Sequence, residues 1–450
     1  MSDIAVFLFL IVIALSNAVH NSHSRGHTRT VPLLTNNTTI TYDYSSSVVD
    51  IDNGIQYGYI LPYIDEWDSF WKPKNGTFEL SPFQFWFKCI ENEVRGYFFL
   101  EDLRVQNHAK EATIFDHGHL GTKVKLTADG IPIKLFRIWH GGGDFFFDIP
   151  PNTPSDHVID IEMKGFRHYT RFKVANCAKK KPRTEETKYI MHIHLRDFSK
   201  PSEFRPAIID GVANHMAYHR CALNLHKYEV VIQREHLNVY LQNEKIAHAV
   251  QQGWITFVIR NPINPAPLHE RNSPSNCYYQ AYTQNMALLH HWQENVKIYF
   301  WDSDEYMATD PDMTPRQFMH LVENGTAVGF KRRMVFCSSC DTKHSEALTM
   351  SLTKSELSVH SHVLRDPKLV VDPNRVGCYI VHWAGCGDKS ENVPLDKAYI
   401  LHFENFYYRR WDMTKRQRFG NETIFKPASM QKICDPTLYN WKNPLPSFHA

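Results

Sequence analysis

Between about residues 188 and 301, short apolar runs alternate with longer segments in which apolar residues recur at helical spacing. A run without polar alternation is typical of a strand buried on both faces, and helices between such strands act as crossovers. The pattern therefore predicts βαβ units with right-handed crossovers and a mostly parallel, Rossmann-type sheet in an α/β domain. The predicted strands are Tyr189–Leu195, Tyr228–Ile232, Ile255–Ile259 and Val296–Trp301.

The segments between these strands carry three helical patterns. Apolar residues recur at helical spacing over 208–223, 237–250 and 278–289. Sheets of this kind bind ligands beyond the carboxyl ends of their strands. We therefore expect the residues just after Trp301 to form the functional site.

The preceding region has a different pattern. From residue 55 to residue 178, short apolar and aromatic runs are broken by turn residues, which predicts a smaller β-rich domain. The charged segment Lys179–Thr187 predicts a linker, and the α/β domain is expected to occupy residues 188–450. The predicted strands of the β-rich domain are Arg95–Leu100, Lys123–Leu126, Ile133–Trp139, Phe145–Phe147 and Val158–Ile161.

The N-terminus carries an apolar run, Ile4–Leu15, followed by the small residues Ser16 and Ala18. This pattern is typical of a secretory leader, so residues 1–19 are interpreted as a cleaved signal peptide or a signal anchor. A buried strand or helix is the alternative interpretation. Residues 20–54 are polar and lack periodicity, which predicts a flexible stem.

Sequons and cysteines agree with a location in the secretory pathway. Asn-x-Ser/Thr sequons occur at Asn36, Asn37, Asn75, Asn324 and Asn421. In an oxidising compartment, most of the 9 cysteines are expected to pair, and an odd number leaves at least one thiol over. We expect a single-pass type II protein of the Golgi lumen, or a secreted protein if the leader is cleaved.

Composition excludes several classes of protein. A hydrophobic content of 43% with a formal net charge of +2 is atypical of a disordered chain. The near balance of 50 Lys and Arg against 48 Asp and Glu argues against a nucleic-acid partner, which requires clustered basic residues. Beyond the N-terminal segment, no apolar run is long enough to predict a membrane span.

An acidic motif follows the last predicted strand: Asp302-Ser303-Asp304-Glu305. Three carboxylates at the exit of a buried strand repel one another, which raises a carboxylate pKa unless a cation or a basic group neutralises them. Mg²⁺ or Mn²⁺ prefers such oxygen ligands and bridges carboxylates to a diphosphate. If the strand continues through the motif, both aspartates lie on one face of the sheet.

Asp-x-Asp alone is a weak signal. It also occurs at Asp50-Ile51-Asp52 in the predicted stem and at Asp310-Pro311-Asp312 in a proline-containing turn. Only the copy at 302–304 ends an apolar strand within the βαβ series, which favours a site for metal and nucleotide. A solvated turn with one aspartate capping a helix is the alternative.

Several sequence blocks together resemble glycosyltransferase family 92. The resemblance covers roughly residues 188–425 and rests on Gln280–Asn285, Val296–Tyr306, Val371–Val376, Val381-His382 and Leu401–Phe403. It implies a GT-A-type fold, a nucleotide-sugar donor such as UDP-galactose, dependence on Mn²⁺ or Mg²⁺, and inversion at the anomeric carbon. The block at Met191–His194 departs from the family pattern, which leaves the donor and acceptor sugars open.

The resemblance also implies roles for individual residues. Asp302 would contact the ribose or the metal, and Asp304 would be the principal metal ligand. His402 is the first choice for a further metal ligand and His382 the second. Three other residues are assigned to the nucleotide: Asn285, Arg409 and Arg410.

An inverting reaction also needs a carboxylate base near the acceptor hydroxyl. Asp388, Glu391 and Glu404 lie in the corresponding half of the chain, and we take Asp388 and Glu404 as the candidates. The function expected from these features is transfer of a hexose, galactose first, from a UDP-sugar to a glycan or glycoprotein acceptor.

Other patterns support competing interpretations. The loop His140–Gly143 resembles an esterase oxyanion loop, but the chain lacks Gly-x-Ser-x-Gly, so a glycine turn between two strands is preferred. Three His-x-His pairs begin at His117, His192 and His360, and they leave a zinc hydrolase as a weaker alternative. A non-catalytic secreted glycan-binding protein on the same scaffold is the main alternative function.

Overall fold

The computed structural model describes eighteen stretches of the chain. They are 28–32, 39–43, 48–50, 55–60, 83–100, 126–139, 142–163, 170–182, 186–195, 206–223, 225–260, 275–310, 313, 315–335, 357–380, 382–385, 391–403 and 422–425. The predicted leader at 1–19 lies outside these residues.

Four parallel strands form the first half of a large sheet. In space they follow the order β15-β14-β13-β16, so the chain builds outward in one direction and then returns to the other side of β13. This is the 3-2-1-4 order of a doubly wound α/β sheet, and the predicted α/β class is confirmed. The strands agree with the predicted ones: β13 Lys188–His194, β14 Lys227–Gln233, β15 Ile255–Arg260 and β16 Val296–Tyr299.

The second half of the sheet has mixed orientation. The long strand β19 (Leu357–Val371) runs antiparallel to β16 and to β18 (Ala327–Val335). Beyond β18 lie β23 (Ala398–Phe403), parallel to β18, and the edge strand β17 (Glu305–Thr309), antiparallel to β23. Two short strands pair outside this order, β22 (Glu391–Asn392) with β18 and β24 (Glu422–Phe425) with β19.

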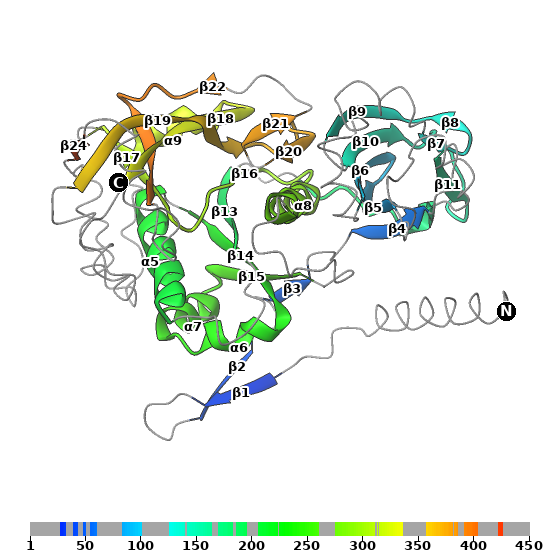
Figure 1. The fold of residues 1–450 in the computed structure, drawn as a ribbon. Coiled ribbons are helices and arrows are strands. Elements are labelled where there is room, and N and C mark those ends of the chain that lie inside the picture. Colours follow the sequence, from blue (N-terminus) through cyan, green and yellow to red (C-terminus); the bar gives the residue numbers. More distant parts are fainter. Residues whose placement is uncertain are drawn as a thin grey trace, which may run out of the picture.

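Helices cover both faces of this sheet, as Figure 1 shows. One face packs against four helices through the largest apolar cluster, and the other face packs against α8 (Ser275–His290). The predicted helical segment at 237–250 is broken into two helices because the Asn243 side chain caps the second by accepting bonds from the amides of Lys245 and Ile246. The four helices are α5 Pro206–Leu223, α6 Leu237–Leu241, α7 Glu244–Gln251 and α9 Pro315–Glu323.

Between α8 and the sheet lies a buried chain of ionic contacts. Glu229 accepts from His192 at 3.2 Å and from His291 at 2.9 Å, and His291 contacts Glu294 at 2.7 Å. Burial alone would lower the pKa of His291, but the Glu229 and Glu294 carboxylates raise it to about 9. His192, one member of a predicted His-x-His pair, therefore belongs to a network that joins α8 to the sheet.

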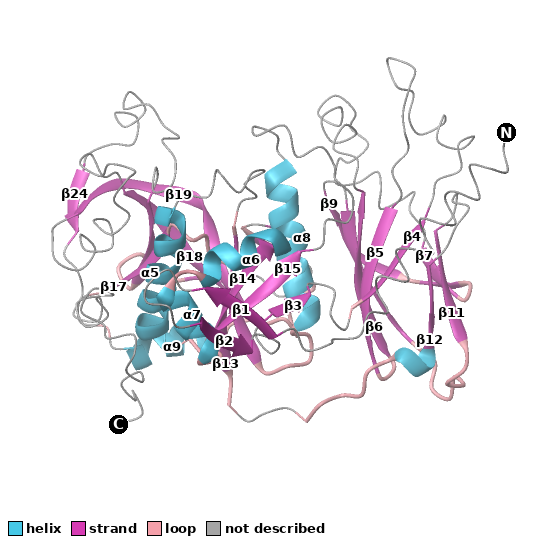
Figure 2. Cartoon of the chain, turned by 90° about the horizontal axis from the view of Figure 1, so that it is seen from below, coloured by secondary structure: helices cyan, strands magenta, loops and turns pink. Residues whose placement is uncertain are grey.

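The β-rich region folds as two antiparallel sheets packed face to face, seen at the right of Figure 2. Their facing side chains form a separate apolar core that includes Phe85, Phe87, Phe145 and Phe172. The first sheet contains β4 Gln56–Ile60, β5 Phe83–Ile90, β6 Glu93–Leu100, β10 Gly142–Asp148 and β9 Lys134–Trp139. The second contains β12 Thr170–Lys173, β11 Val158–Met163, β7 Leu126–Ala128 and β8 Ile131–Pro132.

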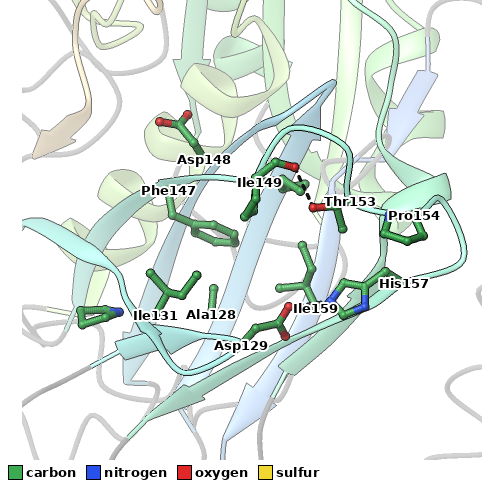
Figure 3. A pocket seen from close by; sticks show the side chains of 12 residues that line it. Ala128, Asp129, Ile131, Phe147, Asp148, Ile149, Thr153, Pro154, His157 and Ile159 are labelled. Carbon is green, nitrogen blue, oxygen red and sulfur yellow. Dashed lines mark hydrogen bonds and ion pairs between the residues drawn. The ribbon is translucent and has the colours of Figure 1, made fainter.

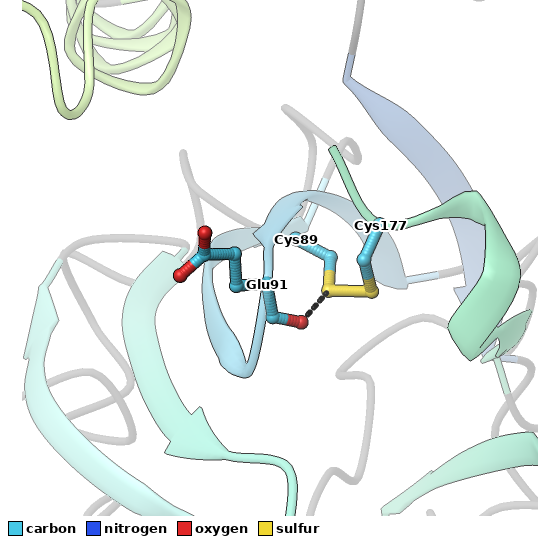
Figure 4. The surroundings of a disulfide bond; sticks show 3 residues. All are labelled: Cys89, Glu91 and Cys177. Carbon is cyan, nitrogen blue, oxygen red and sulfur yellow. Dashed lines mark hydrogen bonds between the residues drawn. A yellow bond between two sulfur atoms is a disulfide. The ribbon is translucent and has the colours of Figure 1, made fainter. Parts of the chain in front are cut away.

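Strands β9 and β10 pair in antiparallel fashion, and residues 140 and 141 of the predicted glycine turn between them lie outside the described residues. A disulfide between Cys89 and Cys177 ties β5 to the segment after the short 3-10 helix Val174–Asn176 (Figure 4). The disulfide agrees with the expectation that cysteines pair in an oxidising compartment.

The sandwich is attached to the α/β unit through α8 and through a buried arginine. Trp86 and Tyr97 of the first sheet pack against Met286 and Leu289 of α8. Arg95 of β6 donates to the carbonyls of Pro373, Val376 and Gly377, in the segment that follows β19. These contacts join the two units directly.

The structure differs from the predicted flexible stem. Two strands, β1 (Thr28–Pro32) and β2 (Thr39–Asp43), form an antiparallel hairpin, and β3 (Val48–Asp50) adds in parallel to β15 at the edge of the large sheet. Val48 packs against the main apolar cluster, which supplies a reason for this strand to form. None of the helices that the structure describes is both long and apolar enough to cross a membrane.

Candidate functional site

The acidic motif forms a tight turn at the carboxyl end of β16. The strand ends at Tyr299, and the amide of Glu305, the first residue of β17, donates to the carbonyl of Asp302 at 3.0 Å. Because a turn replaces the continuing strand, the expectation that alternation places Asp302 and Asp304 on one face does not apply. The turn lies beside β13, where the strand order reverses direction and such sheets bind ligands.

Two buried cations neutralise this turn. Lys368 of β19 is 2.7 Å from Asp302 Oδ2 and 3.8 Å from Glu305 Oε2, although its own side chain is 0% exposed. Arg332 of β18 lies 3.1 Å from Glu305 Oε1. The protein's own basic side chains thus neutralise two of the three carboxylates, Asp302 and Glu305.

The charges set the protonation of the carboxylates. Burial alone would raise the pKa of Glu305, but Lys368, His402 and Arg332 lower it to about 2. Burial also raises the pKa of Asp302, and the Lys368 ammonium more than offsets this, so the net shift is downward. A raised carboxylate pKa, the result expected without neutralisation, is not found for either group.

His402 lies beside the acidic turn, as the first-choice ligand should. It is paired with Glu305 across β23 and β17, and its Nδ1 is 3.1 Å from Glu305 Oε1. Its Nε2 is 3.9 Å from Asp304 Oδ2. Burial lowers the pKa of His402, but Asp304 and Glu305 reverse this and the net pKa is raised.

His382 lies between β20 (Cys378–Ile380) and β21 (Trp383–Gly385). Its Nδ1 is 3.2 Å from the carbonyl oxygen of Pro367, which favours the tautomer with the proton on Nδ1. Burial, followed by the positive charges of Lys368 and Arg332, lowers its pKa to about 3. It is therefore a neutral imidazole close to the site's cations.

Asn285 has a structural role. Its Nδ2 donates to the carbonyls of Ala281 and Tyr379, and its Oδ1 accepts from the amide of Tyr379. Both amide hydrogens are used and the side chain is 2% exposed, so the predicted contact with a nucleotide is replaced by a bond between α8 and β20.

Gln280 and Thr283, also on α8, do reach the site. Gln280 Nε2 donates to Asp302 Oδ1 at 2.7 Å, and Thr283 Oγ1 is 3.2 Å from His194 Nδ1. The middle of α8 thus joins the residues that follow β16 to the carboxyl end of β13. The sequence analysis included Gln280 in a block that carries the resemblance but assigned it no role. Its role follows from its contact with Asp302, which is 22 positions away in the sequence.

The edge strand β17 is held by side chains of α5. His215 Nε2 contacts the carbonyl of Glu305 at 2.7 Å, and Tyr218 donates to the carbonyl of Met307 at 2.6 Å. The amide of Met307 in turn donates to His219 Nε2. These bonds satisfy backbone groups that an edge strand leaves unpaired, and they fix the turn from which Asp304 projects.

The remaining predicted site residues lie outside the described residues: Asp388, Glu404, Arg409 and Arg410. Across the described part of the chain, no three or more His, Cys, Asp or Glu side chains are grouped so that they could hold a metal ion. Asp304 and His402 form a pair of donor groups rather than a complete site. Sequence analysis missed Lys368 and Arg332 because no local pattern marks a buried lysine as the partner of a distant aspartate.

The chain matches none of the models of known protein families, and no curated protein matches it.

Proposed function

We propose that the chain is a metal-dependent inverting glycosyltransferase that transfers a hexose, galactose first, from a UDP-sugar to a glycan acceptor in the secretory pathway. The observation that carries the proposal is the acidic turn Asp302–Glu305 at the reversal point of a 3-2-1-4 sheet. Nucleotides bind at this point in doubly wound folds. The sheet order and the turn support the GT-A-type fold that the sequence resemblance implies.

The donor groups present fit a divalent cation that is shared with the substrate. Asp304 Oδ2 and His402 Nε2 are 3.9 Å apart, whereas two adjacent ligands of an octahedral ion lie about 3 Å apart. Mg²⁺ and related ions commonly take only one or two protein ligands and complete their shell with phosphate oxygens and water. Asp304 and His402 would therefore hold Mn²⁺ or Mg²⁺ together with a diphosphate, after a small closure and loss of any proton from His402.

When bound, such an ion supplies positive charge that stabilises the departing diphosphate. Lys368 and Arg332 add to the positive electrostatic potential at the turn. Both side chains are buried, which limits screening of their charge by solvent. Lys368 and Gln280 each hold one oxygen of Asp302, so this carboxylate is fixed and ionised. Its side chain is still 31% exposed, which allows it to accept a bond from a ribose hydroxyl.

The same cations favour a second candidate function. Lys368 and Arg332 already neutralise Asp302 and Glu305, and His402 lies 3.9 Å from Asp304, so the protein's own side chains compensate most of the negative charge of the turn. A secreted glycan-binding protein that has this scaffold but catalyses no reaction would not need a metal ion at the turn. Asp388 and Glu404 stay the candidates for the catalytic base under the first proposal.

Hydrolysis of UDP-sugars by the purified chain separates the two candidates. A panel including UDP-galactose is incubated with and without Mn²⁺, and released UDP is measured for the wild type and for Asp304→Asn. Asp310→Asn is the matched control, because Asp310 also belongs to an Asp-x-Asp sequence and directly follows β17. The proposal requires Mn²⁺-dependent release that Asp304→Asn abolishes and Asp310→Asn keeps; absence of release from every UDP-sugar refutes it.

A further inference from the structure

The β sandwich contains a pocket at the end where the hairpin β7–β8 meets the loop between β10 and β11. Its volume is about 300 Å³, and Figure 3 shows its lining. The pocket lies between the end of β10 in the first sheet and β7, β8 and β11 in the second, and none of its lining residues belongs to α8 or to the acidic turn. It is therefore separate from the acidic turn at the end of β16.

The lining is mainly apolar. Phe147 is half-buried, while Ala128 and Ile159 are buried and form the inner wall. Ile131, at the rim, is 56% exposed and is the single large hydrophobic side chain found exposed among the residues that the structure describes. Such an arrangement offers a continuous apolar surface to a ligand that enters from solvent.

Two polar side chains of the lining, Asp129 and His157, contact each other on one side of the pocket, and Asp148 lies on the other side (Figure 3). Asp129 Oδ2 is 2.6 Å from His157 Nε2, and its Oδ1 accepts from the amide of Asp160 at 2.9 Å. Asp129 and Gly130 have φ angles of 50° and 76°, as in the tight hairpin turns that match strand twist. The aspartate and imidazole are thus fixed beside the apolar wall before any ligand arrives.

Size and charge restrict the ligand. A volume of about 300 Å³ is at the lower end of small-molecule pockets and accommodates one ring rather than an extended chain. Asp129 and Asp148 are the two carboxylates of the lining, and His157 is its one basic side chain, already paired with Asp129. A net negative lining disfavours phosphate, sulfate and acidic sugars.

We propose that this pocket binds one neutral sugar ring of the glycan acceptor. A pyranose presents an apolar C–H face, suited to Phe147 and Ile131, and a ring of hydroxyls, suited to Asp129 and His157. The proposal rests on the proposed function, because it assigns the acceptor's outer portion to the sandwich. Binding here, away from the acidic turn, would keep a glycan on the enzyme between transfers.

Ligand-observed saturation-transfer NMR on the full chain tests this inference. The probes are the methyl glycosides of galactose, N-acetylglucosamine, mannose and fucose, with sialic acid as the anionic comparison. Two variants alter the pocket: Ile131→Asp changes an exposed rim residue, and Phe147→Leu removes the ring but keeps an apolar side chain. Lys173→Ala, an exposed position on neighbouring β12, is the matched control.

We expect at least one neutral glycoside to bind, sialic acid not to bind, and both pocket variants to weaken binding about 10-fold. Lys173→Ala should bind as the wild type does. UDP-sugar hydrolysis, measured on the same samples, should be unchanged in all three variants. Melting temperatures show whether each variant folds. If Phe147→Leu does not fold, the result for Ile131→Asp alone tests the proposal.

The inference is overturned if no neutral glycoside binds the wild type, or if binding persists unchanged in Ile131→Asp. Absence of UDP-sugar hydrolysis by the wild type refutes the proposed function, whatever the NMR result. The two failures are therefore distinguishable in one set of samples.

Discussion

Arg95 is a buried polar link between the two units. It lies on β6 of the sandwich with 7% of its surface exposed, and its guanidinium donates to carbonyls of the segment after β19. Replacement by methionine keeps the length and apolar stem of the side chain but removes every donor. The Pro373 and Val376 carbonyls then lose the bonds from Arg95, while Gly377 keeps the bond from Tyr97 at 2.6 Å.

The expected loss follows from those two carbonyls. Leaving a buried acceptor unsatisfied costs about 1–3 kcal/mol, so two of them give about 2–6 kcal/mol, and we expect about 3 kcal/mol after partial repacking. This is a large share of a typical unfolding free energy of about 5–15 kcal/mol. Arg95→Lys should fall between, since an ammonium cannot reproduce the planar fork of donors.

Urea denaturation followed by tryptophan fluorescence measures this change. Arg171→Met is the matched control, because Arg171 lies on the same sandwich with a 56% exposed side chain and forms an ion pair with Asp160. Exposed pairs contribute roughly 0–1 kcal/mol, so this control should remain close to the wild type. If Arg95→Met lowers the free energy of unfolding less than Arg171→Met does, the stabilising role assigned to Arg95 is refuted.

Two further predictions concern stability. Glu229 and Glu294 raise the pKa of His291 to about 9, so its stabilising charge is fully present below about pH 6.5 and is lost as the pH rises through 9. The free energy of unfolding should therefore decline between pH 6.5 and 9. His291→Gln should make this decline shallower. Reduction of the Cys89–Cys177 disulfide, or Cys89→Ser with Cys177→Ser, opens a link between positions 88 residues apart and should cost about 4.6 kcal/mol by the loop-entropy relation, measured by calorimetry. A pH-independent free energy from pH 6.5 to 9 contradicts the first, and an unchanged melting temperature on reduction contradicts the second.

Local patterns predicted the elements that are defined by local sequence. The apolar runs at 189–195, 228–232 and 255–259 are strands because both of their faces are buried, and burial leaves a direct trace in composition. The same reasoning identified β6, β9, β10 and β11 of the sandwich and the helix α8, but it did not include β4, β5, β8 or β12. The edge strand Val48–Asp50 was missed because three residues in a polar segment carry no periodic signal.

The chemistry of the site depends on contacts that are distant in sequence. Lys368 and Asp302 are separated by 66 positions, and they meet only because β19 enters the sheet in reverse beside β16. His402 was named from the sequence because it lies in a block that carries the family resemblance, and its role as a metal ligand stays a prediction, whereas Lys368 lies in no such block. Asn285 was predicted to contact the nucleotide because it lies in a block that carries the resemblance. In the structure its buried side chain bonds to the backbone of Tyr379 and so links α8 to β20.

Binding of Mn²⁺ measured by electron paramagnetic resonance, with and without UDP, tests the central claim most directly. We predict that the wild type binds the ion tightly only when UDP is present, because Asp304 and His402 supply two ligands and the diphosphate the others. Asp304→Asn should weaken this binding about 100-fold or more, since even residues that only support metal ligands contribute about 10- to 100-fold, and Asp310→Asn should have no effect. UDP-independent binding, no binding, or equal binding by Asp304→Asn and the wild type would contradict the account.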